Sequence, residues 1–239
     1  MLRTVILSTE TTHHLYYVWQ LLELCTVEAV ILETNSVSPK FNTNHKFENE
    51  REEYEKFQVL RNGPKIFENL LAVYAFSSIN DQACIQKIEE LNPDMIIIFG
   101  TSKVCPRIIS IPRKACLNLH GGAPEYYRGL DSHLWAIYHN DFGNLVTTMH
   151  FVEPEIDSGR IIFQEQLQLS KETTLIKLRI INTVACIRMS ALAINSMDQN
   201  SFLPCRSQLR KGRYYSFMPS DLKEVCLKKY NHYIKNLSD

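Results

Sequence analysis

The sequence has no net charge of either sign and no long hydrophobic run. Its 239 residues include 26 Lys and Arg against 26 Asp and Glu, so the formal net charge is zero. This balance argues against a nucleic-acid-binding protein that relies on a broad basic surface. The longest apolar runs, such as residues 95–99, fall far short of the ~18 residues of a membrane span, and the first residues lack the apolar segment of a signal peptide. We therefore expect a cytoplasmic protein without membrane insertion.

The cysteines and glycines also lack the spacing of several common sites. The seven cysteines are odd in number and no two form a C-x-x-C pair, which argues against a disulfide framework and against a zinc ribbon. The histidines show no metal-ligand spacing, so no metal is expected. The glycine motifs of dinucleotide and ATP sites, the G-x-S-x-G of lipase-type hydrolases and the H-E-x-x-H of zincins are all absent.

The sequence does contain short apolar runs that alternate with helical patterns. Runs rich in Val, Ile and Leu predict buried strands, and the helical spacing between them predicts the crossover helices of a parallel sheet. We therefore predict an α/β fold with a Rossmann-like open, mostly parallel sheet as a catalytic domain over residues 1–200. Residues 201–239 are expected to form a C-terminal appendage, with a hairpin at 202–217 and a helix at 222–234. The expected strands cover residues 4–7, 27–32, 71–76, 95–99, 115–120, 146–152 and 160–167, and the main helices residues 11–24, 78–91, 131–139 and 173–197.

Residues suited to acid–base chemistry lie on the strand predicted at 115–120. Asn118 and His120 are two positions apart, so both side chains point to the same face. An amide can donate to a developing oxyanion, and an imidazole can move protons near neutral pH. The same pair also fits a turn-closing asparagine and a histidine satisfied by backbone. Asp157 fits a plain turn before Gly159 as well as an acid that orients His120.

An ordered set of segments resembles the core of the folate-dependent formyltransferases. The set consists of residues 118–129, Ser132, residues 135–137, residues 147–150 and residues 157–159. The resemblance implies the formyltransferase fold and transfer of a formyl group from 10-formyltetrahydrofolate to a primary amine. It implies that Asn118, His120 and Asp157 are catalytic, and leaves open whether His120 or Asp157 is the effective base. The residues it implies for folate binding are Phe99, Gly100, Thr101, Val104, Val152, Glu153 and Ile156.

Three features of the sequence distinguish among the amines used by this family. The Gly121–Gly122 pair and the stretch 211–219 resemble the small nucleotide-sugar N-formyltransferases, and residues 8–14 lack the glycine-rich phosphate loop of the purine enzymes. We therefore expect a nucleotide-linked amino sugar as the partner substrate, such as dTDP-4-amino-4,6-dideoxyglucose, for O-antigen and lipopolysaccharide synthesis. The alternatives are methionyl-tRNA, glycinamide ribonucleotide, or a non-catalytic folate- or nucleotide-binding protein. Candidate substrate-binding residues are Ser8, Thr9, His13, Lys65, Tyr126, Tyr127 and Arg128.

The predicted hairpin also suggests a subunit interface. A lone hairpin would expose Tyr214, Tyr215, Phe217 and Met218, which is more apolar surface than a monomer usually leaves uncovered. A homodimer with this segment in or near the interface is therefore expected. The basic cluster around residues 206–213 fits a solvated hairpin, with phosphate or RNA contact as the alternative.

Overall fold

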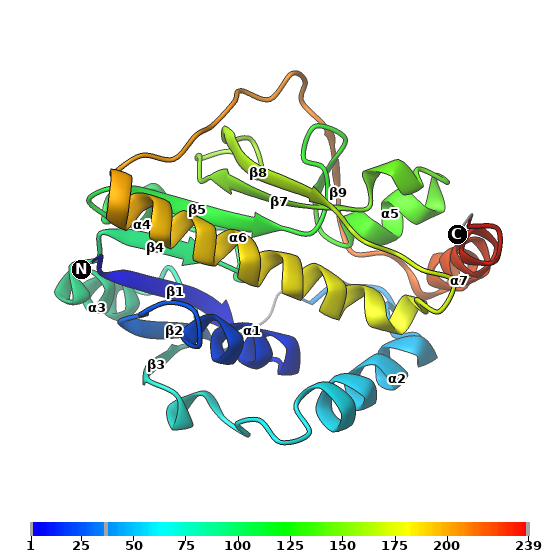
Figure 1. Ribbon diagram of the computed structural model, residues 1–239, viewed down its shortest axis with the longest axis horizontal. Helices are drawn as coiled ribbons and strands as arrows, with labels where there is room; N and C mark the ends of the chain where they lie inside the picture. Colours follow the sequence, from blue (N-terminus) through cyan, green and yellow to red (C-terminus); the bar gives the residue numbers. More distant parts are fainter. Residues whose placement is uncertain (1, 36–37, 238–239) are drawn as a thin grey trace.

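The computed structural model describes residues 2–35 and 38–237. Seven strands form one sheet in the order β3-β2-β1-β4-β5-β7-β8 (Figure 1). Strands β1 to β5 are parallel, whereas β7 is antiparallel to both of its neighbours, so the expected mostly parallel sheet is confirmed. The strands are β1 Thr4–Thr9, β2 Ala29–Glu33, β3 Ala72–Phe76, β4 Met95–Ile98, β5 Ala115–His120, β6 Tyr127–Gly129, β7 Val146–Phe151, β8 Ile161–Gln166 and β9 Arg213–Tyr215. The α-helices are α1 Thr12–Leu22, α2 Lys46–Tyr54, α3 Gln82–Leu91, α4 Pro106–Ser110, α5 Ser132–Tyr138, α6 Leu178–Asn200 and α7 Ser220–Lys235.

Each face of the sheet is covered by its own layer of helices. Successive side chains of a strand point to opposite faces, so Ile6 of β1 joins the apolar cluster of α1 and α6, while Val5 and Leu7 join that of α3 and α4. All three side chains are fully buried, and each such burial contributes about 1.5–3 kcal/mol. The hydroxyl groups of Tyr17 and Ser190 are 2.8 Å apart, which joins α1 to α6 within this layer.

Helix α6, with 23 residues, is the longest helix in the described part of the chain. Together with the 3-10 turn before it, the segment Leu175–Asn200 is long and apolar enough to cross a membrane by length and composition alone. In the structure 67% of its apolar window is buried, as is common for the core helix of a globular domain. Figure 1 shows it lying along the sheet beside α1. Packing against the sheet and α1 therefore accounts for its composition.

A third apolar cluster joins α2 and α5 to the C-terminal helix α7. It includes Phe47 of α2, Ile137 of α5 and Tyr230 of α7, each almost fully buried. Lys223 of α7 is only 3% exposed, and its ammonium donates to the carbonyl of Thr43 and to Glu48. Helix α2 is thus fixed to the C-terminal part of the chain.

The expected hairpin at 202–217 is wrong. Strand β9 pairs in parallel with β6, and Arg206 exchanges backbone hydrogen bonds with Ile161, so the segment runs extended across the molecule. Gly212, which suggested a hairpin turn, instead allows close packing, because a Cβ there would lie 2.3 Å from the carbonyl oxygen of Pro124. The expected helix at 222–234 is present as α7.

The chain itself covers much of the apolar surface that suggested an interface. Met218 is fully buried, and the ring of Tyr215 stacks on Trp135 with their centroids 5.0 Å apart. Tyr214 remains 53% exposed. This segment therefore leaves less apolar surface for a subunit interface than the sequence suggested.

Candidate active site

The carboxyl ends of β1, β4 and β5 meet at one edge of the sheet beside a cleft of about 920 Å³. Open α/β sheets bind their ligands at this edge, because parallel strands bring their final residues and following loops together there. Asn118 and His120 of β5 and Asp157 of the loop after β7 all line the cleft. The structure thus brings together the three residues that the sequence analysis proposed as catalytic.

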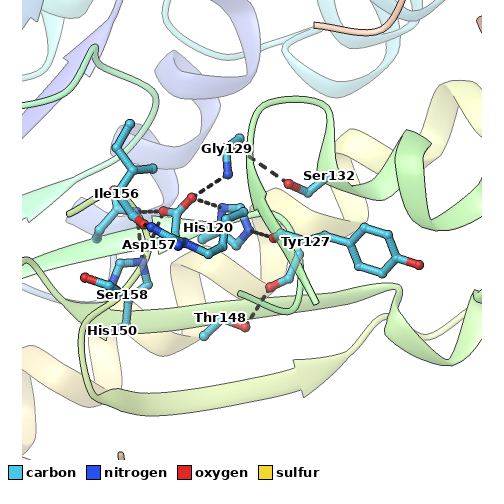
Figure 2. A network of polar contacts seen from close by, with 12 residues as sticks. His120, Tyr127, Gly129, Ser132, Thr148, His150, Ile156, Asp157 and Ser158 are labelled. Atoms are coloured by element: carbon cyan, nitrogen blue, oxygen red, sulfur yellow. Dashed lines mark hydrogen bonds and ion pairs between the residues drawn. The ribbon is translucent and has the colours of Figure 1, made fainter. Parts of the chain in front are cut away.

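The Asp157 carboxylate contacts both other side chains. Its Oδ2 lies 3.5 Å from His120 Nδ1 (Figure 2). Its Oδ1 lies 3.4 Å from Asn118 Nδ2. The backbone N–H of Gly129 donates to Asp157 Oδ2 at 2.7 Å. Asp157 has a φ of +51°, a left-handed conformation that aspartate adopts more readily than most residues. This turn geometry aims its carboxylate at the imidazole.

Hydrogen bonding assigns distinct roles to the two ring nitrogens of His120. Nε2 lies 2.8 Å from the carbonyl oxygen of Tyr127, so it must carry a hydrogen and donate it. Nδ1 is therefore the nitrogen that can gain or lose a proton beside Asp157. Burial alone would raise the pKa of Asp157, but His120, His150 and the Gly129 N–H outweigh it and hold that pKa well below its usual range. Asp157 is accordingly an anion at neutral pH.

His150 of β7 belongs to the same cluster, although the sequence did not mark it as a catalytic residue. Its Nδ1 donates to the carbonyl of Phe151 at 2.7 Å, and its Nε2 lies 3.1 Å from Asn118 Nδ2 and 3.4 Å from Asp157 Oδ1. The side chain is 2% exposed. The antiparallel register places His150 directly opposite Asn118. Pairing of these two strands was the signal that could have identified it.

All seven residues expected to bind folate line the cleft. They lie on two loops, one after β4 and the other after β7. Glu33, which was not predicted, holds the first loop: its carboxylate accepts from the N–H of Ser102 at 2.6 Å, from the Ser102 hydroxyl at 2.7 Å and from the N–H of Ile79 at 3.0 Å. The two loops supply apolar side chains to the lining of the cleft. The apolar members are Phe99, Val104, Val152 and Ile156.

The candidate substrate residues are divided between the cleft and other places. Thr9 and His13 line the cleft. Ser8 does not, because its buried hydroxyl donates to the carbonyl of Phe99, and Lys65 is an exposed residue elsewhere. Arg128 is 4% exposed and donates to the carbonyl of Ile156, so it supports the second loop from behind.

Tyr126 and Tyr127 also lie outside the cleft and line a separate shallow cavity. The Tyr127 hydroxyl donates to Asp141, while its carbonyl fixes His120. The guanidinium of Arg210 lies 3.4 Å from the centre of the Tyr126 ring. The geometry therefore does not support either tyrosine as a substrate ligand.

The far wall of the cleft contains charged residues that the sequence analysis missed. Arg51 of α2 and Arg179 of α6 both line it, beside His13 and His14. Burial and the neighbouring His14 lower the pKa of His13 well below its usual value, while burial and Arg179 lower that of His14 to about 3. Both histidines are neutral at pH 7. No group of three or more His, Cys, Asp or Glu side chains suited to a metal ion occurs in residues 2–35 and 38–237.

Comparison with known proteins identifies similar chains. Residues 2–181 match the family model described as formyl transferase. A methionyl-tRNA formyltransferase of Fusobacterium nucleatum is 31% identical over 161 residues, which is 66% of this chain and 50% of the relative. This chain spans 35% to 54% of the length of three such bacterial relatives.

Two solved structures share the fold at low sequence identity. A 4-N formyltransferase from Francisella tularensis has a TM-score of 0.58 at 15% identity, covering 90% of this chain and 76% of that one. The phosphoribosylglycinamide formyltransferase of Streptococcus pneumoniae has a TM-score of 0.58 at 16% identity, covering 83% of this chain and 100% of that one.

Proposed function

Because the chain belongs to the formyl transferase family, we propose that it transfers a formyl group from 10-formyltetrahydrofolate to the primary amine of a nucleotide-linked amino sugar. The observation that carries this proposal is the contact of Asp157 with Asn118 and His120 in the lining of the cleft. It provides an amide donor, a titratable nitrogen and a fixed anion within one site. An amine nucleophile needs no Ser or Cys from the protein.

Each of the three residues has a distinct chemical task in formyl transfer. When bound, the folate supplies the formyl carbon as an electrophile. The Asn118 amide N–H stabilises negative charge that develops on the formyl oxygen. His120 Nδ1 accepts the proton that the amine loses and passes it toward the departing folate nitrogen. Asp157 stabilises the protonated imidazole, and its low pKa makes it a weak base near neutral pH, so we assign the base to His120.

The acceptor that we propose is an amino sugar rather than methionyl-tRNA. A solved structure of a sugar N-formyltransferase shares this fold, and the zero net charge offers no broad basic surface for tRNA. The curated relatives named above act on methionyl-tRNA, which makes that substrate the second candidate. A dTDP-4-amino-4,6-dideoxyglucose acceptor would place the enzyme in O-antigen and lipopolysaccharide synthesis. A cytoplasmic location and a homodimer remain predictions from the sequence.

An acceptor panel tests the proposal. Purified protein is given 10-formyltetrahydrofolate with dTDP-4-amino, dTDP-3-amino or UDP-amino sugars, glycinamide ribonucleotide, or methionyl-tRNA, and release of tetrahydrofolate is followed. We expect turnover confined to an amino sugar. Turnover confined to tRNA or the ribonucleotide would support formyl transfer but contradict the amino sugar as the acceptor. If no acceptor in the panel leads to release of tetrahydrofolate but folate still binds, the result would favour a non-catalytic folate-binding protein.

A further inference from the structure

Arg51 of α2 is a mostly buried cation at the cleft with unused hydrogen-bonding capacity. Its side chain is 17% exposed and lines the cleft. Within residues 2–35 and 38–237, its buried Nε has no hydrogen-bond partner. Its ion-pair contact there is with Glu48, whose Oε1 lies 3.5 Å from Nη2. A buried guanidinium donor without a partner is energetically unfavourable, so the site is incomplete as it stands.

Glu48 cannot fully balance Arg51, because other groups use the same carboxylate. Lys223 donates to Glu48 Oε1 at 2.9 Å, and the N–H of His45 donates to Glu48 Oε2 at 3.1 Å. Arg179 is in the opposite situation, since two carboxylates, those of Glu52 and Glu55, contact its guanidinium. This network of three cations and three carboxylates is neutral as a whole, and the pair of Arg51 with Glu48, at 3.5 Å, is the longest of these four ion pairs.

One further carboxylate, that of Asp131, lines the cleft near Arg51; burial raises its pKa, and it already accepts the N–H of Met218 at 2.8 Å. His13 is close enough to Arg51 and Arg179 for both to lower its pKa, and it is neutral at pH 7. Burial and the charge of Arg179 lower the pKa of Arg51, whereas Glu48, Glu55 and Glu52 raise it. An anion that enters the cleft would meet a guanidinium that is 17% exposed and shares its Glu48 partner with Lys223. Arginine binds phosphate oxygens in this way through its planar fork.

We propose that Arg51 binds a phosphate group of the acceptor substrate and is a specificity-determining residue of the cleft. This inference rests on the proposed function, because a nucleotide-linked sugar carries a pyrophosphate. Glycinamide ribonucleotide and tRNA carry phosphates as well, so the shared chemistry is a phosphate ester. The carboxylates of the folate tail are the competing anions.

A binding experiment tests the anion site without turnover. Calorimetry with inorganic pyrophosphate compares the unchanged protein with Arg51→Gln, Arg51→Lys and the exposed control Arg61→Gln. Since a hydrogen bond to a charged group is the interaction removed, Arg51→Gln should weaken binding about 10- to 100-fold. Arg51→Lys keeps the charge near Glu48, so its affinity for pyrophosphate should fall between those of Arg51→Gln and the unchanged protein. Arg61→Gln should bind pyrophosphate like the unchanged protein. Equal binding by Arg51→Gln and the unchanged protein would overturn the proposal.

Steady-state kinetics then assigns the anion to one substrate. Arg51→Gln should raise the KM for the formylated acceptor about 10- to 100-fold, while kcat and the KM for the folate donor should stay within about threefold of the unchanged enzyme. A rise confined to the folate KM would overturn the proposal in favour of the folate tail. Comparing a dTDP-amino sugar with glycinamide ribonucleotide identifies the source of the phosphate. If no amine is formylated, the proposed function fails, while the pyrophosphate experiment still decides the role of Arg51.

Discussion

At the scale of single residues, the position of Asp157 explains how His120 can accept a proton in the proposed reaction. Its carboxylate lies 3.5 Å from His120 Nδ1, and the Gly129 N–H fixes it in place. Asp157→Asn keeps the shape and the acceptor for that N–H but removes the charge that stabilises protonated His120. We expect kcat to fall about 10²- to 10⁴-fold with folate affinity within a few-fold. Single-turnover rates and folate titration measure the two quantities, and an unchanged kcat would contradict the role of Asp157.

Buried histidines should also make the fold sensitive to acid. Burial lowers the pKa of His14 to about 3 and, despite a hydrogen bond to Val146, that of His133 to about 4. Both are neutral in the folded protein, whereas in the unfolded chain they bind protons below about pH 6.5. The unfolding free energy should therefore fall as the pH drops from about 6.5 to 4, by about 1.4 kcal/mol per pH unit for each histidine at full effect.

Denaturant unfolding at several pH values measures this dependence. His133→Asn should reduce the slope of the unfolding free energy against pH between about pH 6 and 4.5. The reason is that one of the groups that stay neutral in the folded protein is removed. His232 is exposed, so His232→Gln should keep the slope of the unchanged protein. Equal slopes for the unchanged protein and His133→Asn would show that His133 does not contribute.

At the scale of elements, the pairing of β6 with β9 supports the active site. Gly129 ends β6 with a φ of +92°, and a Cβ there would lie 2.2 Å from the carbonyl oxygen of Tyr215. Gly129→Ala should therefore destabilise the fold by at least about 1–2 kcal/mol. It should also lower kcat, because the N–H of Gly129 orients Asp157. Thermal unfolding and initial rates check both effects.

Gly143 provides the matched control for that substitution. A Cβ added to Gly143 meets nothing within 4 Å, so Gly143→Ala should leave the midpoint of unfolding and the rate nearly unchanged. Similar behaviour of the two alanine variants would contradict the argument that β9 crowds Gly129.

The sequence predicted local elements well and long-range pairing poorly. The run Met95–Ile98 is apolar at every position, and a strand buried on both faces is the structure such a run favours. The three-residue strands β6 and β9 lie 84 residues apart between Gly129 and Arg213, and no local pattern predicts that they pair. His150 was missed for the same reason, since its role depends on its register opposite Asn118. The two-residue spacing of Asn118 and His120 was by contrast visible on one strand.

At the scale of the whole molecule, the C-terminal segment bears on the predicted homodimer. The C-terminal segment buries Met218 and stacks Tyr215 on Trp135 within one chain. Light scattering at micromolar concentration measures the assembly directly. The sequence predicts twice the mass of one 27.8 kDa chain. A monodisperse monomer would contradict the dimer and would agree with a self-covered C-terminal segment.

Formyl transfer in the cleft at the edge of the sheet is tested most directly by comparing the rates of two proteins. The measurement is tetrahydrofolate release from 10-formyltetrahydrofolate with dTDP-4-amino-4,6-dideoxyglucose, for the unchanged protein and for His120→Asn. We expect turnover by the unchanged protein and a loss of about 10²-fold or more in the variant, with folate affinity within a few-fold. Equal rates for the two proteins would contradict the assignment of His120 and, with it, the proposed site of transfer.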